Sequence, residues 1–347
     1  MHIADSDYFI DGCHGELATV PIIRCRRNEL AGIILYFLCG SLLLKSCDAG
    51  TKIDITPTNP DYFVPNRFDG KTILITGGAQ GLGKAVALRA AKEGANVVIA
   101  DWLEEGGLNT TALINANGGG RAYFVLADVS KTEDADRMVK EAVEQFGGID
   151  YALNNAGVLD GVYTGEEFNY EQQKPLLAAP LHKATDEYWQ KVMDINAGGV
   201  FKSLRAELNQ MLKQGKGGAI VNVGSVAGLT GVGGFPAYVA SKHAVNGLTR
   251  NAAIDYAAFG IRVNSVNMAP MDTSMMKAIN VLSAVRAKEN CTMAKLIKDK
   301  SILMNADSNN RLSTVWEQAA VILFLLSDEA SNLTGGTFAT DGGWTAY

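Results

Sequence analysis

Short apolar runs alternate with segments of helical period from about residue 66 to the C-terminus. Seven runs have the length of buried strands: "KTILIT" (71–76), "NVVIA" (96–100), "YFVLAD" (123–128), "IDYAL" (149–153), "AIVNVGS" (219–225), "IRVNSVN" (261–267) and "TFAT" (337–340). Apolar residues at helical spacing lie between most of them, for example at 85–93, 134–146 and 315–326. This alternation predicts an α/β domain with a doubly wound, seven-stranded parallel sheet and helices on both faces. The ligand site of such a sheet lies beyond the carboxyl ends of its strands.

Residues 1–65 do not follow this alternation, and we predict an N-terminal extension and linker followed by one domain at 66–347. Residues 30–44, "LAGIILYFLCGSLLL", carry no charge. They are shorter than the roughly 20 residues of a spanning helix and fall within the range of a signal-peptide apolar region. The lead before them contains acidic residues, and no convincing cleavage site follows them. We expect a cytoplasmic protein, with membrane tethering through this apolar segment as the alternative.

Composition narrows the class of protein further. Apolar residues make up 47% of the chain and charged residues 20%, which is typical of a folded globular protein, and the net charge of -6 argues against a nucleic-acid partner. Of five cysteines, only Cys291 lies in the predicted domain. No cysteine spacing resembles a zinc site, and we predict no metal.

A glycine-rich turn, "TGGAQGLG", follows the first predicted strand and opens a predicted helix. Gly77, Gly81 and Gly83 permit a tight turn that brings backbone N–H groups, including those around Leu82, close to a pyrophosphate at the positive end of the helix. The spacing is G-x-x-x-G-x-G, and by itself it is equally compatible with simple turn chemistry.

The second strand ends in "IADW", where Asp101 is placed to bind the ribose hydroxyls of NAD. The same carboxylate would repel the additional phosphate of NADP. Neither Gln80 in the glycine turn nor Trp102 after the acid is basic, so the sequence favours NAD over NADP. The alternative role of Asp101 is to cap the helix that follows.

Polar and small residues also follow the third and fourth strands. Asp128 and Val129 are suited to an adenine amine and ring, although Asp128 can also cap the next helix. Asn155, Ala156 and Gly157 of "NNAG" form a small, amide-rich wall beside the expected cofactor.

The segment "FPAYVASKHAVNGLTR" places Tyr238 and Lys242 on one face of a helix, downstream of Ser225 at the end of the fifth strand. A free tyrosine titrates near pH 10. A neighbouring ammonium and the positive charge of an oxidised nicotinamide are expected to lower the Tyr238 pKa far enough for acid-base chemistry near neutrality.

Together, "TGGAQGLG", "NNAG", "INAGG", "GS" and "YVASK" resemble the larger, single-domain branch of the short-chain dehydrogenase/reductase family over residues 67–347. The resemblance implies a Rossmann-like fold and a catalytic tetrad. In it Tyr238 exchanges the proton, Ser225 binds the substrate oxygen, Lys242 binds ribose and lowers the phenol pKa, and Asn196 holds a relay water.

The sequence departs from the family pattern in two places. Met271 stands where the family usually has glycine after Pro270, and residues 158–184 are longer than is common after the fourth strand. The lid position, 273–313, is rich in apolar residues, which suggests an apolar substrate, although the same residues would also pack a lid onto its own domain. We expect the dinucleotide to be bound by Gly77, Gly81, Leu82, Gly83, Asp101, Trp102, Asp128, Val129, Asn155, Ala156, Gly157, Tyr238, Lys242, Pro270 and Thr273.

These features predict an NAD-dependent oxidoreductase that transfers a hydride between a secondary alcohol or ketone and nicotinamide. An NADPH-dependent carbonyl or 3-oxoacyl reductase is the alternative within the enzymes, and a non-catalytic dinucleotide-binding protein is the alternative outside them. The resemblance further implies a homodimer or homotetramer assembled through the helices after the fourth and fifth strands.

Overall fold

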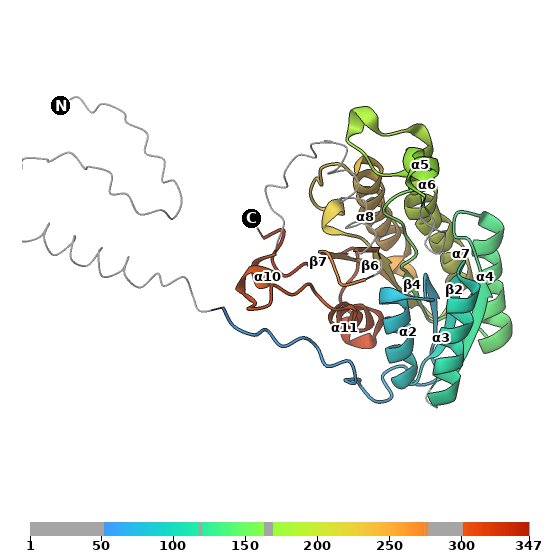
Figure 1. The fold of residues 1–347 in the computed structure, drawn as a ribbon. Coiled ribbons are helices and arrows are strands. Elements are labelled where there is room, and N and C mark those ends of the chain that lie inside the picture. Colours follow the sequence, from blue (N-terminus) through green and yellow to red (C-terminus); the bar gives the residue numbers. More distant parts are fainter. Residues whose placement is uncertain (1–51, 118–119, 163–168, 274, 277–300, 347) are drawn as a thin grey trace, which may run out of the picture. The chain divides into compact units, whose positions relative to one another are not determined.

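A parallel sheet of seven strands runs through the part of the chain that the structure describes, in the order β3-β2-β1-β4-β5-β6-β7 (Figure 1). This computed structural model describes residues 52–117, 120–162, 169–273, 275–276 and 301–346, and Lys52–Tyr347 form one structural unit. The strands are β1 (Thr72–Thr76), β2 (Asn96–Asp101), β3 (Ala122–Leu126), β4 (Tyr151–Asn154), β5 (Gly218–Val223), β6 (Ile261–Met268) and β7 (Thr337–Thr340).

Helices cover both faces of the sheet. One layer contains α2 (Gly81–Lys92), α3 (Glu104–Asn117) and α11 (Val315–Leu326), and the other contains α4 (Thr132–Phe146), α7 (Gly199–Gln214) and α8 (Pro236–Tyr256). Shorter elements lie near the carboxyl edge of the sheet or in its connections. They are α5 (Tyr170–Gln173), η1 (Lys174–Leu176), η2 (Leu181–Lys183), α6 (Asp186–Met193), η3 (Asp194–Gly198), η4 (Val226–Gly228), η5 (Ala257–Phe259), α10 (Ile302–Ala306) and η6 (Asp328–Ala330).

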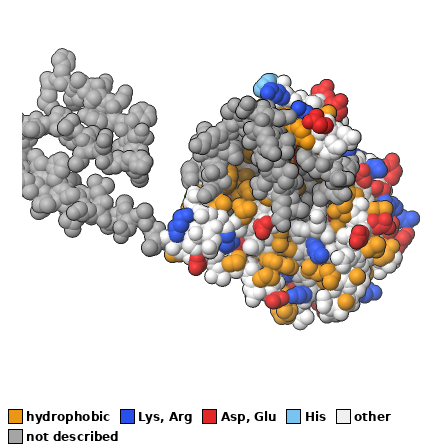
Figure 2. Space-filling model, in the orientation of Figure 1, with side chains coloured by type: hydrophobic (Ala, Val, Ile, Leu, Met, Phe, Trp, Pro, Cys, Tyr) orange, Lys and Arg blue, Asp and Glu red, His pale blue; other side chains and the backbone are white. Residues whose placement is uncertain are grey.

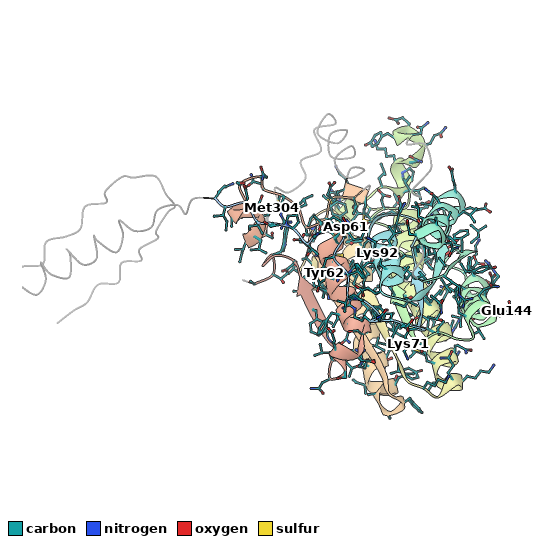
Figure 3. The ribbon with its side chains drawn as sticks, turned by 90° about the horizontal axis from the view of Figure 1, so that it is seen from below. Asp61, Tyr62, Lys71, Lys92, Glu144 and Met304 are labelled. Atoms are coloured by element: carbon teal, nitrogen blue, oxygen red, sulfur yellow. The ribbon has the colours of Figure 1, made fainter. Side chains whose placement is uncertain are left out.

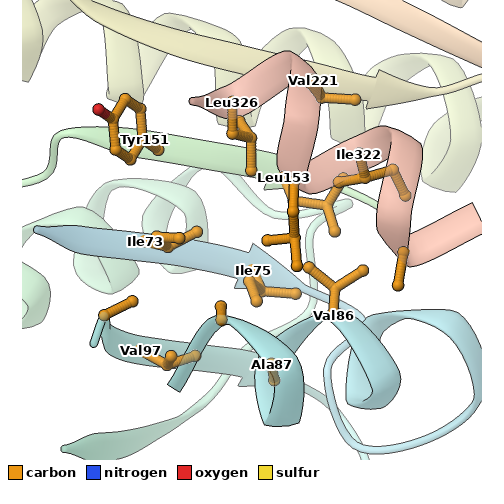
Figure 4. Packing of buried hydrophobic residues seen from close by; sticks show 14 of the residues in the cluster. Ile73, Ile75, Val86, Ala87, Val97, Tyr151, Leu153, Val221, Ile322 and Leu326 are labelled. Atoms are coloured by element: carbon orange, nitrogen blue, oxygen red, sulfur yellow. The ribbon is translucent and has the colours of Figure 1, made fainter. Parts of the chain in front are cut away.

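Strands β1 and β2 are largely apolar because both of their faces are buried. Ile73 and Ile75 of β1 point into the layer of α2 and α11, where Ile322 packs, whereas Leu74 points into the layer of α4, α7 and α8. Figure 4 shows the first of these layers, with Val86 between β1 and α11. The predicted doubly wound α/β fold is therefore confirmed.

The predicted element bounds differ from the structure by a few residues. The strand predicted from residue 149 begins at Tyr151. The backbone of Ile149 is instead hydrogen-bonded to the side chain of Gln214: its N–H donates to Oε1 at 3.0 Å, and its carbonyl accepts from Nε2 at 2.7 Å. The helix predicted from residue 85 begins at Gly81, inside the glycine turn.

Residues 56–65, within the predicted linker, run along the domain and contact α2. The buried Glu93 at the end of α2 accepts hydrogen bonds from the Val64 N–H (3.1 Å) and Arg67 Nε (2.7 Å), and pairs with Arg89 (2.9 Å). Figure 3 shows Asp61, Tyr62 and Lys92 beside one another, where Lys92 pairs with Asp61 at 3.3 Å.

The apolar segment 30–44 lies outside the described residues. Within the described ranges, none of the helices is both long and apolar enough to span a bilayer. On the face shown in Figure 2, lysine and arginine side chains are interspersed with aspartate and glutamate.

Candidate active site

A cavity of about 700 Å³ opens at the carboxyl ends of the strands. It is lined by most of the residues that the sequence singles out: Gly77, Gly81, Leu82, Asp101, Trp102, Val129, Asn155, Ala156, Gly157, Ser225, Tyr238, Lys242, Pro270 and Thr273. Gly83, Asp128 and Asn196 are not among the described lining residues. The fold therefore brings the glycine turn and the tyrosine helix to one concave site.

The glycine turn has the backbone geometry that its sequence predicts. Gly77 and Gly81 have φ of 69° and 55°, a region that favours glycine. A Cβ on Gly83 would lie 2.1 Å from the Gly77 carbonyl oxygen, so Gly83 acts in packing α2 against β1. A Cβ on Gly81 would meet nothing within 4 Å, so the turn is open on the side where α2 begins. This open helix N-terminus fits a pyrophosphate.

Asp101 ties the end of β2 to the glycine turn. Its Oδ2 accepts from the Ala79 N–H at 2.9 Å and its Oδ1 from the Leu103 N–H at 2.9 Å. Burial raises the pKa of this carboxyl, and the backbone hydrogen bonds act in the opposite direction. Since a carboxylate oxygen has more than one lone pair, both oxygens can still accept from a ribose.

Asp128 is held locally. Its Oδ1 accepts from the Ser130 N–H at 3.0 Å and the Ser130 hydroxyl at 2.7 Å. Its neighbour Val129 lines the cavity. Asp128 thus closes a turn before α4 and does not cap that helix, whose N-cap position is Lys131. An adenine contact through Asp128 stays a prediction.

Tyr238, Ser225 and Lys242 lie together at the cavity. The Tyr238 hydroxyl is hydrogen-bonded to Ser225, whose Oγ also accepts from the Ala227 N–H at 3.1 Å. Lys242 Nζ lies 5.6 Å from the centre of the Tyr238 ring and donates to the Val223 carbonyl at 2.8 Å.

The predicted lowering of the Tyr238 pKa does not follow from these side chains. Burial raises the pKa of Tyr238, and only the hydrogen bond with Ser225 lowers it. Burial also lowers the pKa of Lys242 to about 8. Because the predicted lowering includes the positive charge of an oxidised nicotinamide, it stays a prediction for the complex with the dinucleotide, and burial of the phenolate opposes it.

Asn196 lies in η3, a single π-helical turn that joins α6 to α7. Its Oδ1 accepts from the Val158 N–H (2.8 Å), and its Nδ2 donates to the Val158 carbonyl (2.8 Å) and to Ser241 Oγ (3.0 Å). Asn196 thus connects the tyrosine helix to the chain leaving β4. A π-helical turn often marks a functional site, and the resemblance was the signal that identified this one.

Sequence reasoning missed the residues that hold the turn before Ser225. The buried Asn267 of β6 accepts from the Ser225 N–H (3.2 Å) and from Asn246 Nδ2 (2.9 Å). Asn246 Oδ1 in turn accepts from Ser265 Oγ (2.7 Å). The available signal was the polar residues in "NSVN", which are unusual in a buried parallel strand.

The altered turn after β6 still reaches the cavity. Pro270, Met271 and Thr273 line it, and Met271 pairs with Ser313 in a parallel bridge. Among described non-glycine residues only Asn66 and Asn310 have positive φ, so methionine replaces glycine here without backbone strain.

The remaining wall is largely apolar. Its large apolar members include Leu159, Val232, Phe235, Met275, Met276 and Trp344. The long 158–184 segment supports this wall, because its buried Ala178 belongs to the same apolar cluster as Val158 and Tyr188, against which Phe235 and Tyr238 pack. Trp344 was not predicted, since only the fold brings the C-terminal residues to the cavity.

Comparisons with known proteins agree with this geometry. The short chain dehydrogenase family model matches residues 71–282. A 3beta-hydroxysteroid dehydrogenase of Mediterraneibacter gnavus is 38% identical over 290 residues, covering 82% of this chain and 98% of that protein. A cyclohexanol dehydrogenase of Acinetobacter sp. is 37% identical over 286 residues, covering 82% and 99%.

Solved structures give the same result. The crystal structure of levodione reductase has a TM-score of 0.67 and 32% identity, covering 81% of this chain and 100% of that one. The crystal structure of NAD+-bound xylitol dehydrogenase has a TM-score of 0.66 and 29% identity, covering 80% and 99%. This chain therefore belongs to the short-chain dehydrogenase/reductase family, whose members are oxidoreductases that act on CH–OH groups.

Proposed function

We propose that this protein is an NAD-dependent oxidoreductase that interconverts a cyclic secondary alcohol and its ketone. The observation that carries the proposal is that one cavity brings together all the groups that this reaction needs. Tyr238 and Ser225 are hydrogen-bonded to each other with Lys242 beside them, and the open glycine turn lies next to Asp101. Such a site has a proton donor, an oxygen-binding hydroxyl and a dinucleotide cradle.

The charges around the cavity favour NAD over NADP. The Asp101 carboxylate lies where the adenosine ribose is expected, and it would repel a 2′-phosphate. Lys242 is the only lysine or arginine among the described residues that line the cavity, and it lies at the tyrosine helix. The structure of NAD+-bound xylitol dehydrogenase, a structural neighbour, agrees with this preference.

The dinucleotide, when bound, accepts or donates the hydride. Ser225 and Tyr238 direct hydroxyl groups at the substrate oxygen, where charge develops as the carbonyl becomes an alkoxide. Tyr238 takes the alcohol proton during oxidation and returns it during reduction. The family resemblance implies that Lys242 binds the ribose hydroxyls and, together with an oxidised nicotinamide, favours the phenolate. It also implies that Asn196 holds a water of the proton relay.

An apolar ring system suits the substrate part of the cavity. The wall built from Phe235, Met275, Met276 and Trp344 offers apolar area and few polar partners. Relatives named as acting on cyclic alcohols or ketones, among them the 3beta-hydroxysteroid and cyclohexanol dehydrogenases, support the same class.

A screen for NADH formation tests the proposal. Purified full-length protein is incubated with NAD or NADP and with cyclohexanols, hydroxysteroids, linear sugar alcohols or hydroxyacyl thioesters, and reduced nicotinamide is followed by absorbance. We expect turnover on cyclic alcohols with NAD. Faster turnover with NADP would overturn the assignment of Asp101, and turnover restricted to linear substrates would overturn the substrate class.

A further inference from the structure

The N-terminal residues 52–55, which we call the strap, pair with the chain just after α10. The Ile53 N–H donates to the Ala306 carbonyl at 3.2 Å, and the Ser308 N–H donates to the Ile53 carbonyl at 2.9 Å. In Figure 1 the strap lies at the blue start of the coloured chain, beside the red α10. The strap thus adds a short parallel pairing to a segment more than 250 residues away in sequence.

The strap also completes the hydrogen bonding of a buried carboxylate. Asp307 is 2% exposed. Its Oδ1 accepts from the N–H groups of Asn309 (2.9 Å) and Arg311 (3.3 Å), and its Oδ2 accepts from the Ile55 N–H (2.9 Å). Arg311 Nε in turn donates to the Ile55 carbonyl at 2.8 Å. Removing the strap leaves a buried anionic oxygen and a guanidinium short of partners, which destabilises this local arrangement.

Two short series of contacts connect this carboxylate with the cavity wall. On the first path, Arg311 pairs with Glu317 (2.9 and 3.1 Å), which forms the capping box of α11 with Thr314. Between Arg311 and Thr314 lies Ser313, whose carbonyl accepts from the Asp272 N–H at 3.3 Å. Asp272 lies between Met271 and Thr273, both in the cavity wall.

The second path runs through α10 to the C-terminal residues. The Leu303 N–H donates to the Gly342 carbonyl at 3.0 Å. A Cβ on Gly342 would lie 2.9 Å from Ser301 Oγ, so the two segments are closely packed. Trp344 lies two residues after Gly342 and lines the cavity. The strap therefore contacts residues 306–313, and these residues and α10 contact the turn after β6 and the C-terminal residues.

We propose that the strap is a positioning segment for the active site, which fixes residues 306–313 so that Met271, Thr273 and Trp344 complete the cavity wall. It precedes residue 71, where the match to the family model begins, so the strap belongs to the N-terminal extension of this chain. The expected effect on dinucleotide binding rests on the proposed function, whereas the effect on the wall itself does not.

Two variants of the full-length protein test this role. Ile55→Pro removes the N–H that Asp307 accepts, and Asp307→Asn removes the charge that the strap and loop surround. Thr56→Pro is the matched control, since it places proline one residue further along and no hydrogen bond of the Thr56 N–H occurs within the described chain. Hydrogen exchange by mass spectrometry and NAD titration by calorimetry are measured on all four proteins.

We expect exchange in peptides covering 270–273 and 341–346 to become about tenfold faster in Ile55→Pro and Asp307→Asn, and exchange in β1 to stay unchanged. NAD affinity falls about three- to tenfold in the same variants, and Thr56→Pro behaves as wild type. Unchanged exchange in both peptides, or faster exchange with unchanged NAD affinity, would overturn the positioning role. Wild-type protein that binds no NAD would instead refute the proposed function, and the exchange data would still test the strap.

Discussion

Glu207 of α7 is a fully buried glutamate whose pKa is strongly displaced. Its Oε2 accepts from Asn154 Nδ2 at 3.0 Å, and within the described residues neither Glu207 Oε1 nor Asn154 Oδ1 has a hydrogen-bond partner. Burial raises the pKa of Glu207 from 4.5 to about 8, so the side chain is neutral in the folded protein at pH 7. A neutral carboxyl can donate a hydrogen bond, and an amide oxygen without a partner can accept one.

The raised pKa makes stability depend on pH. Below pH 4.5 the folded and unfolded chains both hold the Glu207 proton, and between 4.5 and about 8 only the folded chain holds it. The stabilisation is therefore fully present below the unfolded pKa and is lost as pH rises through this window.

Glu207→Gln should remove this dependence, because glutamine stays neutral and still offers a donor. We expect the variant to be more stable than wild type at pH 7 by about 3 kcal/mol, from roughly 1.4 kcal/mol per pKa unit. Urea unfolding at pH 5 and pH 8 measures the effect. Equal loss of stability with rising pH in both proteins would show that Glu207 is not the titrating group.

Among the elements, the turn between β5 and η4 shows how α8 and β6 together position Ser225, the residue proposed to bind the substrate oxygen. Asn267 binds both the Ser225 N–H and Asn246, and a Cβ on Gly224 would lie 2.2 Å from Asn267 Oδ1. The turn is therefore fixed by side chains that do not enter the cavity themselves.

Asn267→Ala leaves the Ser225 N–H and Asn246 Nδ2 without their acceptor. We expect a loss of about 2–3 kcal/mol in the free energy of unfolding, and a fall in kcat of about tenfold or more as Ser225 loses its orientation. NAD affinity should stay within about twofold, because Asn267 is not among the described lining residues. Steady-state kinetics and NAD titration separate the two effects, and a fall in NAD affinity with unchanged kcat would contradict this role.

Elements differed in how far the sequence could predict them. The glycine turn was predictable because positive φ at Gly77 and Gly81 restricts the residue type locally. The start of β4 was not, since it depends on Gln214, which is distant in sequence and approaches only in the fold. The burial that raises the Tyr238 pKa in the protein alone was not predictable either, because burial is a property of the assembled cavity.

At the scale of the whole molecule, the helices after β4 and β5 expose apolar side chains. Phe201 on α7 is 48% exposed, and Ile254 on α8 is 79% exposed. These residues lie on the two helices through which the family resemblance implies assembly, and the homo-oligomer stays a prediction.

Phe201→Lys should weaken that assembly, because it places a charge in an apolar contact. We expect light scattering to show a dimer or tetramer for wild type and a shift toward the single chain for the variant. Leu108→Lys on α3 is the matched control, since Leu108 is similarly exposed at 52% but lies on a different helix. A wild-type protein with the mass of one chain would contradict the assembly.

The sequence predicted the sheet and most of the cavity because strand length, helical period and the residues after each strand are local patterns. Trp344 and the strap contacts of Asp307 were beyond it, since both depend on segments that are far apart in sequence. Residues 30–44, for which membrane tethering is the alternative prediction, lie outside the described residues.

The most direct measurement of the central claim is the activity of Tyr238→Phe beside its NAD affinity. The substitution removes only the hydroxyl that is hydrogen-bonded to Ser225, which is the group proposed to exchange the proton with the substrate. We predict that NADH formation from a cyclic alcohol falls by about 10³-fold or more, while calorimetry gives an NAD affinity within about threefold of wild type. Turnover at the wild-type rate in Tyr238→Phe would contradict the account.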